Sequence, residues 1–526
     1  MKTRCILHAL TFVSAALVVF AAGDARRPNV LLVISDDQSW VHTSASGYKA
    51  ISTPAFDRVA RSGILFNRAY AGSPGCSPSR AALLTGRHAW MIEQAGTHAS
   101  SFPRKYVTYP ELLRKAGYHV GLTGKGWGPG NWKLDEWPHN PAGPSFDART
   151  TTPPFGAMSK NDYAANFADF LAKKSNDQPF CFWVGGGEPH RGFTKGSGLQ
   201  SGKKLESVVV PPFLPDTPEV RSDILDYLVE IEYFDRHLGK MLQMLQERGE
   251  LENTLVIVTS DDGMAFPRAK ANCYDYGIHV PLAVAWPARV PGGRKVDDLV
   301  GFVDLTATIL EAARVTRPAS APAPVGRSLM TILTSTAQGI VDPSDARVYS
   351  SRERHSSSRP GNLGYPQRAM RTRDYLFIRN FAPERWPAGD PQSFGSSGKK
   401  GKKGAAAEDG GQGGAGKLGR MHGAYHDIDG SPTLELITRD ANDPKTARFL
   451  QLAVAKRPAE ELYDVRKDPG CLVNLATDPA HQKTRQRLAK EFEDYLRSTG
   501  DVRVTGNGEI WESYPRYSPL REFPKK

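Results

Sequence analysis

Asn29-Val30-Leu31-Leu32-Val33-Ile34-Ser35-Asp36-Asp37 is a continuous apolar run that ends abruptly in two acids. An unbroken apolar run rich in β-branched residues is typical of a parallel strand that is buried on both faces. A second run of this kind, Leu255-Val256-Ile257-Val258-Thr259-Ser260, ends in Asp261-Asp262-Gly263. We therefore expect two central strands, each with carboxylates at its carboxyl end, where α/β proteins bind their ligands.

Predicted strands and helices alternate over the first three hundred residues. Apolar runs predict further strands at residues 64–66, 119–123 and 180–184, and periodic segments predict helices at residues 54–61, 109–116, 161–173 and 218–248. Thr217 and Pro218 suit the cap and the first position of the last of these helices. The alternation favours a three-layer α/β/α sandwich with a mostly parallel sheet.

The chain divides into an N-terminal α/β domain at residues 26–344 and a smaller C-terminal α+β domain at residues 345–526. Residues 348–350 and 375–378 alternate in the manner of antiparallel strands, and residues 484–496 predict a closing helix. Between them, residues 393–419 form a Gly/Lys/Ala low-complexity segment, for which we expect a mobile surface insertion. Its lysines suit an acidic polymer, although a solvated linker is the simpler interpretation.

Residues 1–25 have the pattern of an export signal. Lys2 and Arg4 precede an apolar run at residues 6–22, and small residues follow as a cleavage site. The sequence therefore predicts a periplasmic or secreted protein, with an uncleaved anchor as the alternative. No other stretch is long and apolar enough to cross a bilayer, so we expect no stable membrane insertion after cleavage.

The composition narrows the class of protein. The chain has 526 residues and a net charge of +12, which suits a polyanionic partner or simply serves solubility. No nucleic-acid motif with interleaved aromatics is present, which argues against RNA or DNA as a partner.

The five cysteines are too widely spaced for a disulfide scaffold. One disulfide among Cys181, Cys273 and Cys471 is still compatible with the sequence. The sequence is also compatible with a homodimer.

The two acid pairs predict a cation site. Asp36, Asp37, Asp261 and Asp262 would repel one another strongly at one sheet edge unless a cation neutralised them. An all-oxygen ligand set suits a hard cation such as Ca²⁺ or Mg²⁺. A single Asp-Asp pair would more often be a turn or helix cap, but two pairs after two buried strands favour the metal.

A cysteine motif follows the first predicted helix–strand unit. Cys76-Ser77-Pro78-Ser79-Arg80 runs into an expected helix with Ser77 as its N-cap and Pro78 at its first position. This would put Cys76 at the positive end of a helix. Taken alone, Cys76 would be a structural cysteine and Arg80 a surface arginine.

Cys-x-Pro-Ser-Arg followed by Leu83-Leu84-Thr85-Gly86-Arg87 resembles the signature of the type I sulfatases. The resemblance implies an alkaline-phosphatase-like fold and a maturase that oxidises Cys76 to formylglycine (3-oxoalanine), whose hydrate is the nucleophile. It also implies that the acid pairs and the oxidised Cys76 bind Ca²⁺, in preference to Mg²⁺. Arg80, on the same helix face, would hold the hydrate or the acid cluster.

Three further motifs resemble those of the sulfatases. Lys125, in Gly124-Lys125-Gly126-Trp127, matches a sulfate-binding lysine, and Lys270 matches a second one, with Arg268 as its fallback. Glu188-Pro189-His190-Arg191 makes His190 the expected acid for the departing atom. Trp127 stands where the family has a histidine, and His98 is a candidate substitute for it.

Other details resemble the heparan N-sulfatase branch of the family, such as Gly128-Pro129 and Asn474-Leu475-Ala476. That branch implies substrate contacts from Arg352, Glu353 and His355, with residues 427–432 closing the pocket. The expected reaction is hydrolysis of an N- or O-sulfated glycan, such as a sulfated glycosaminoglycan sugar. The alternatives are a phosphatase or phosphonate hydrolase of the alkaline phosphatase superfamily, and a catalytically silent basic glycan-binding protein if Cys76 is not oxidised.

Overall fold

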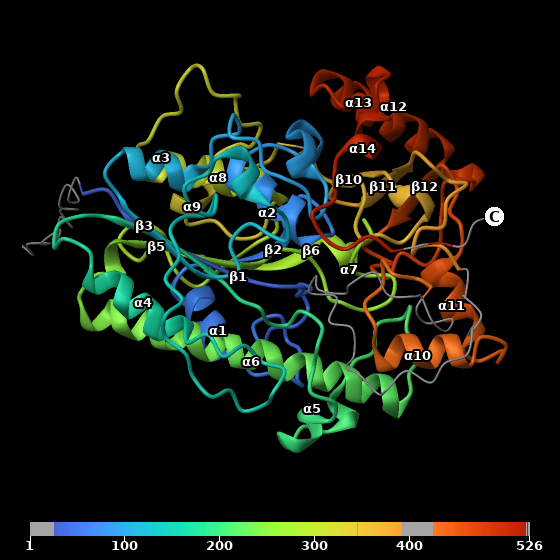
Figure 1. Ribbon diagram of the computed structural model, residues 1–526, viewed down its shortest axis with the longest axis horizontal. Coiled ribbons are helices and arrows are strands. Elements are labelled where there is room, and N and C mark those ends of the chain that lie inside the picture. The colour runs from blue at the N-terminus through green and yellow to red at the C-terminus, as the bar shows by residue number, and fades with distance from the viewer. Residues whose placement is uncertain (1–25, 345, 392–423, 522, 524–526) are drawn as a thin grey trace, which may run out of the picture.

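The computed structural model describes residues 26–344, 346–391, 424–521 and 523 (Figure 1). The predicted signal at residues 1–25 and the low-complexity segment at residues 393–419 lie entirely outside the described residues. No helix among the described residues is long and apolar enough to cross a membrane. The described chain forms two sheets with helices packed around them.

The larger sheet has eight strands in the order β3-β4-β1-β5-β6-β2-β7, with β8 paired to β2. Strands β3, β4, β1 and β5 run parallel, whereas β6 is antiparallel to both of its neighbours. This mixed sheet confirms the predicted α/β fold class. The strands are β1 (Asn29–Ser35), β2 (Ile64–Tyr70), β3 (His119–Gly124), β4 (Phe180–Gly185), β5 (Thr254–Ser260), β6 (His279–Ala285), β7 (Arg294–Val296) and β8 (Val300–Gly301).

Helices cover both faces of this sheet, which makes three layers (Figure 1). Val30, Leu32 and Ile34 of β1 face one apolar core, and Leu31 and Val33 face the other. The first core is covered by α2 (Cys76–Thr85), α3 (Tyr109–Lys115), α8 (Phe302–Ala312) and α9 (Met330–Thr334). The second is covered by α1 (Pro54–Ser62), α4 (Tyr163–Ala172) and α6 (Pro218–Glu247).

Helix α6 is the longest described helix and ends one residue before the predicted boundary. The Thr217 side chain accepts a hydrogen bond from the Val220 amide, as its predicted role as cap requires. Short helices and 3-10 turns join the main elements: α5 (Ser197–Gln200), α7 (Asp275–Ile278), η1 (Ala89–Met91), η2 (Glu93–Gly96), η3 (Trp132–Asp135), η4 (Leu205–Ser207) and η5 (Leu251–Asn253).

The smaller sheet is antiparallel, in the order β12-β11-β10-β9. Its strands are β9 (Val348–Arg352), β10 (Gln367–Arg371), β11 (Tyr375–Asn380) and β12 (Glu460–Asp464). The sequence predicted β9 and β11 as shorter strands and did not single out β10. One face packs on α12 (Gln482–Ser498), and the other packs on Tyr274 and Ile278 of the larger unit.

The remaining helices also belong to the C-terminal part of the chain. They are α10 (Pro432–Arg439), α11 (Ala447–Val454), α13 (Val502–Thr505) and α14 (Ile510–Ser513), with 3-10 turns η6 (Pro360–Asn362) and η8 (Pro479–His481). Helix α10 packs on α11 and on α6. The Thr433 hydroxyl at the start of α10 donates to Asp223 of α6 at 2.5 Å. This contact ties the loop before α10, which contains Asp427 and Asp429, to the larger unit.

Candidate active site

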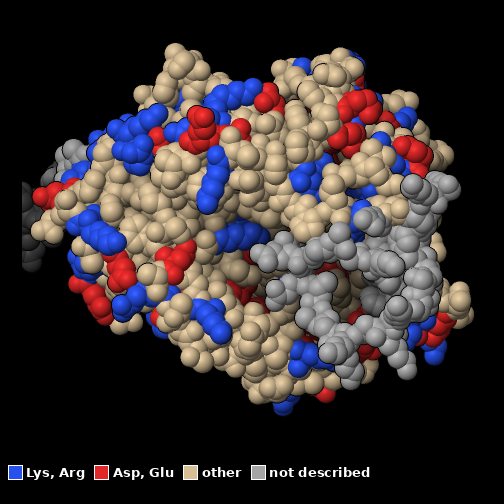
Figure 2. Space-filling model, viewed as in Figure 1, with Lys and Arg blue, Asp and Glu red and all other residues tan. Residues whose placement is uncertain are grey.

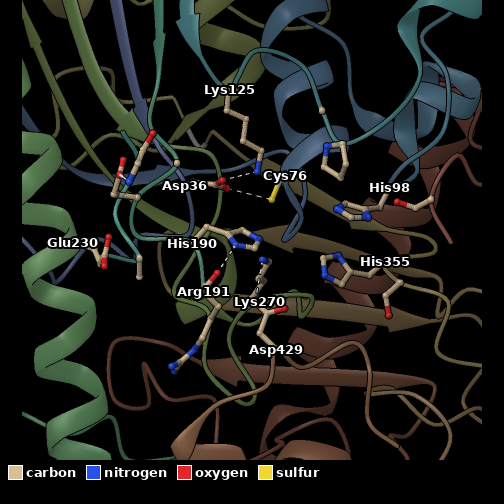
Figure 3. A pocket seen from close by; sticks show the side chains of 18 of the residues that line it. Asp36, Cys76, His98, Lys125, His190, Arg191, Glu230, Lys270, His355 and Asp429 are labelled. Atoms are coloured by element: carbon tan, nitrogen blue, oxygen red, sulfur yellow. Dashed lines mark hydrogen bonds and ion pairs between the residues drawn. The ribbon is translucent and has the colours of Figure 1, made fainter. Parts of the chain in front are cut away.

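A cavity of about 440 Å³ lies where the loops after β1, β3 and β4 meet the start of α2 (Figure 3). Parallel strands bring these loops to one edge of the sheet, as expected for an α/β fold. Both parts of the chain contribute to the wall of this cavity, among others through Asp36, Cys76, His98, Lys125, His190, Glu230, Lys270, His355, Asp429 and Arg516.

Cys76 lies at the first position of α2, so the helix begins two residues earlier than predicted. The N-cap is Gly75 in an extended conformation, and the Ser77 hydroxyl instead accepts a hydrogen bond from the Ala99 amide at 3.3 Å. The prediction of Ser77 as N-cap was therefore wrong, although Cys76 still lies at the positive end of the helix. All ten residues of α2 are buried.

The Cys76 thiol is in contact with the first acid pair. Its Sγ lies 3.3 Å from Oδ1 of Asp36 and 3.9 Å from Oδ1 of Asp37. Burial, followed by the charge of Asp36, raises the pKa of Cys76 well above that of a free thiol. An unmodified Cys76 is therefore a protonated thiol at neutral pH, which is a poor nucleophile.

The two acid pairs meet because β1 and β5 are neighbours in register, with Ser35 opposite Ser260. The Asp37 amide donates to Oδ1 of Asp261 at 3.1 Å, and Asp37 itself has a left-handed φ of 73°. Ligand atoms of Asp36, Asp37 and Cys76 lie within 4.8 Å of one another, as do those of Cys76, Asp261 and Asp262. Cys76 is thus common to both groups.

The surroundings of the Asp262 carboxyl group indicate whether this cluster fits a metal ion. Both of its carboxyl oxygens are buried and have no hydrogen-bond partner among the described residues. Burial, followed by the charges of Asp37 and Asp261, raises the pKa of Asp262 well above its usual value. Unpaired buried carboxylates of this kind are unfavourable without a cation, so the donor set fits a hard metal ion.

Arg80 joins the acid cluster to the loop after β3. Its Nε donates to Oδ2 of Asp261 at 2.7 Å, and its Nη1 donates to the carbonyl oxygen of Lys125 at 2.6 Å. The side chain is fully buried, unlike a surface arginine. Arg80 therefore fixes the orientation of Asp261 relative to Lys125.

Two lysines and a histidine surround the Cys76 thiol (Figure 3). Nζ of Lys125 lies 2.5 Å from Oδ2 of Asp36, and Nζ of Lys270 lies 2.7 Å from Oδ2 of Asp37. Nε2 of His190 is 4.0 Å from the same Asp37 oxygen. The two lysines pair with Asp36 and Asp37, and all three side chains line the cavity, which suits an anionic ligand.

His98 and His355 form the opposite wall of the cavity. Their ring centroids are 4.6 Å apart, and Nδ1 of His98 is buried without a hydrogen-bond partner among the described residues. Burial lowers the pKa of His355 to about 3 and that of His98 well below 6.5. Both imidazoles are therefore neutral at pH 7 and can donate or accept one hydrogen bond per nitrogen.

Not every predicted residue reaches the cavity. Arg352 pairs with Asp427 at 2.6 Å, and Glu353 pairs with Arg368 and Arg503, both at 2.7 Å. Neither Arg352 nor Glu353 lines the cavity.

Two positions near the predicted lysines also turn away from the site. Trp127 packs edge to face on Phe102, 5.2 Å between centroids, in the apolar core. Arg268, the fallback for Lys270, donates to the carbonyl oxygens of Leu452 and Cys471. The cysteines Cys181, Cys273 and Cys471 are buried and free, so the disulfide that the sequence left open does not form among them.

Asp429 belongs to the site, although it was predicted only within a pocket-closing segment. Its Oδ2 accepts a hydrogen bond from Nζ of Lys270 at 3.1 Å. Burial opposes its ionisation, but Lys270 and His190 lower the pKa of Asp429 to about 2. Glu230 and Arg516 also line the cavity, and no motif pointed to either residue.

A model of the sulfatase family matches residues 28–315, more than half of the 526 residues. The chain belongs to the sulfatase family. A second model, described as the C-terminal part of N-sulphoglucosamine sulphohydrolase, matches residues 269–386 of this sulfatase. It is 28% identical to human N-sulphoglucosamine sulphohydrolase, with 96% of this chain and 97% of that protein covered. An ulvan-active sulfatase of Formosa agariphila is 24% identical, with 90% and 76% covered.

Solved structures share the fold of this sulfatase. A protein in complex with its substrate D-glucosamine-2-N,6-O-disulfate aligns with a TM-score of 0.59 at 18% identity, covering 90% of this chain and 99% of that one. A phosphonate monoester hydrolase of Agrobacterium radiobacter aligns with a TM-score of 0.57 at 16% identity, covering 91% and 97%. At these identities the likeness shows the fold alone, which is that of the sulfatases and alkaline phosphatases.

Proposed function

We propose that this sulfatase hydrolyses a sulfate ester or sulfamate on a sulfated glycan, with a formylglycine made from Cys76 as the nucleophile. The observation that carries the proposal is the position of Cys76, which shares one buried site with four carboxylates, two lysines and a histidine. The substrate class rests on the likeness to human N-sulphoglucosamine sulphohydrolase over 96% of the chain. A sugar of the heparan type is the first candidate.

Asp36, Asp37, Asp261 and Asp262, together with residue 76, would hold Ca²⁺ rather than Mg²⁺, because Mg²⁺ is usually held by only one or two carboxylates and this buried set offers four. When bound, the cation supplies positive charge and lowers the pKa of a hydroxyl group. Formylglycine supplies a hydroxyl nucleophile, which the protonated Cys76 thiol does not.

The cationic side chains have separate roles. Without a cation, Lys125 and Lys270 neutralise Asp36 and Asp37. With a cation on these acids, the two ammonium groups can bind the outer oxygens of a sulfate group instead. His190, beside Asp37 and on the cavity wall, would hold the proton for the departing nitrogen or oxygen. Arg80 keeps Asp261 in place.

The substrate would be recognised in the cavity rather than on a continuous basic surface. On the face shown in Figure 2, lysines and arginines alternate with aspartates and glutamates. The net charge of +12 therefore does not gather into one patch on this face. A sulfate group on the substrate would meet Lys125 and Lys270 inside the cavity.

A substrate panel tests the proposal. Protein that is produced with a formylglycine-generating maturase is assayed on an aryl sulfate, on sulfated glycosaminoglycan oligosaccharides and on matched phosphate and phosphonate esters. We expect turnover of the sulfates and its loss in Cys76→Ala. Preference for phosphate or phosphonate esters would favour the alternative that the phosphonate monoester hydrolase fold suggests. Glycan binding without any turnover would favour the silent binding protein.

The export signal at residues 1–25, the periplasmic or secreted location, the maturase as partner and a homodimer remain predictions of the sequence. The domain boundary near residue 345 also remains a proposal, with the larger sheet ending at Gly301 and the smaller one starting at Val348.

A further inference from the structure

One side of the cavity is acidic. Ala157, Ser159, Gly187, Glu188 and Glu230 line it, and we call this part the acidic arm. Figure 3 shows Glu230, on α6, on the opposite side of the cavity from His98 and His355. Glu230 is only 3% exposed, and its buried Oε1 has no hydrogen-bond partner among the described residues.

The neighbouring acids are occupied by the protein itself. Glu188 accepts hydrogen bonds from the Ser159 amide at 2.7 Å and from the Tyr163 hydroxyl at 2.9 Å. Asp226, one turn before Glu230 on α6, accepts from the amides of Gly196 and Gly198, both at 2.8 Å. Buried carboxyl groups normally have such partners, so the unfilled one at Glu230 points to a ligand in the cavity.

The charges around Glu230 restrict the chemistry of that ligand. Burial, followed by the charges of Glu188 and Asp226, raises the pKa of Glu230 to about 8. Arg191 also lines the cavity, but Asp223 holds its guanidinium through hydrogen bonds of 2.5 and 2.9 Å. The acids and the paired guanidinium of Arg191 therefore offer no free positive charge to a sulfate or carboxylate group here, whereas a hydroxyl group can exchange hydrogen bonds with the carboxyl group of Glu230.

We propose that Glu230 is a specificity-determining residue, whose carboxyl group hydrogen-bonds a hydroxyl group of the sugar that carries the sulfate. This inference rests on the proposed function for the identity of the substrate. It assigns the two ends of the cavity to different parts of that substrate. The sulfate group faces Lys125 and Lys270, and the hydroxylated, uncharged edge of the sugar faces the acidic arm.

Kinetics on two substrates test this role. N-sulfoglucosamine offers sugar hydroxyls to Glu230, and an aryl sulfate does not. In Glu230→Leu the ratio of kcat/KM for the sugar to kcat/KM for the aryl sulfate should fall about tenfold, as expected for one lost buried hydrogen bond. Glu230→Gln, which still donates and accepts, should recover most of that ratio. Glu247→Leu, at the exposed end of α6, is the matched control.

Equal loss on both substrates, no loss on either, or an equal effect of Gln and Leu would each overturn the proposal. Binding separates this failure from a failure of the proposed function. In a Cys76→Ala background, where no turnover is expected, calorimetry should show that Glu230→Leu weakens N-sulfoglucosamine binding about tenfold. An unchanged Kd, or no sugar binding by the parent, contradicts the role of Glu230. Absence of turnover by the oxidised wild type contradicts the proposed function instead.

Discussion

At the scale of single residues, the proposed chemistry rests mainly on Cys76, Asp262 and Arg80. Asp262 is the acid with two buried oxygens and no hydrogen-bond partner among the described residues, and Arg80 is the buried cation that holds Asp261. The site is therefore unfavourable as long as it contains protein groups alone. Its acids could hold a cation, and its buried thiol is the group that the proposed function requires to be oxidised.

The substitution Asp262→Asn tests the cation site through stability. In a chelator, the variant should unfold at a higher temperature than the wild type, because it removes a buried carboxyl group that is crowded by Asp37 and Asp261. Added Ca²⁺ should raise the melting temperature of the wild type, and raise that of the variant by less. Thermal melts in chelator, Ca²⁺ and Mg²⁺ measure this. A wild-type melting temperature that does not change when Ca²⁺ is added would contradict the proposed cation site.

Arg80→Lys should leave the fold intact and weaken the site. A lysine keeps the charge but cannot donate to Asp261 and to the Lys125 carbonyl oxygen together. We expect a loss of about 10- to 100-fold in activity or in Ca²⁺ affinity, the usual effect of losing a residue that orients metal ligands. Titration of activity with Ca²⁺ measures it, with the exposed Arg114→Lys as control. An unchanged Ca²⁺ requirement would show that Arg80 does not position Asp261.

The sequence predicted the residues that adjoin strand ends or lie in motifs, and the structure brings Asp36, Cys76, Lys125, His190 and Lys270 to one cavity. It could not predict Glu230, because that residue is one of many buried positions along α6 and only the packing of α6 brings it to the cavity. Nor could the sequence show that Arg352 and Glu353, which we expected to contact the substrate, do not line the cavity. Their charges are paired within the smaller unit, with Asp427, Arg368 and Arg503.

At the scale of elements, α2 is held at both ends by different units. Its start lies on the acid cluster, and beyond its end His88 hydrogen-bonds the Tyr495 hydroxyl of α12 at 2.7 Å. His88 also stacks on Trp90, with centroids 4.2 Å apart. Apolar runs and periodic segments predicted strands β1 to β5 and the three layers, although not the order of the strands. The attachment to α12 joins residues 407 positions apart, which no local pattern encodes.

His88 makes this attachment sensitive to pH. Burial, followed by the charge of Arg87, lowers the pKa of His88 to about 3. A histidine with a lowered pKa stabilises the fold fully above its unfolded pKa, near 6.5, and this stabilisation is lost as the pH falls toward 3. In His88→Gln the stability deficit relative to wild type should therefore shrink by about 2 kcal/mol from pH 7 to pH 5. Denaturant unfolding at the two pH values measures it, and a constant deficit would contradict a neutral buried His88.

At the scale of the whole molecule, loops of the smaller unit complete the cavity that the larger unit begins. Asp429 contacts Lys270, and Arg371 of β10 donates to Asp275 of α7 at 3.1 Å. Arg457 donates to Asn272 at 2.6 Å across the same junction. These buried polar contacts accompany the apolar packing of the smaller sheet on Tyr274 and Ile278.

Such a junction should make the two units unfold together. Separating them would expose Tyr274 and Ile278. It would also break the hydrogen bonds of Lys270 to Asp429 and of Arg371 to Asp275, each at a cost of about 1–3 kcal/mol. We expect one calorimetric transition, and Ca²⁺ should shift all of it. Two resolved transitions, of which only one moves with Ca²⁺, would show that the smaller unit folds independently of the site.

The state of Cys76 decides the central claim most directly. The peptide that contains residues 76–80 is measured by mass spectrometry, in protein from its native host or produced with a formylglycine-generating maturase. Conversion of the cysteine to formylglycine predicts a mass lower by about 18 Da than that of the unmodified peptide. Only unmodified Cys76 in protein from the native host would contradict the proposed nucleophile.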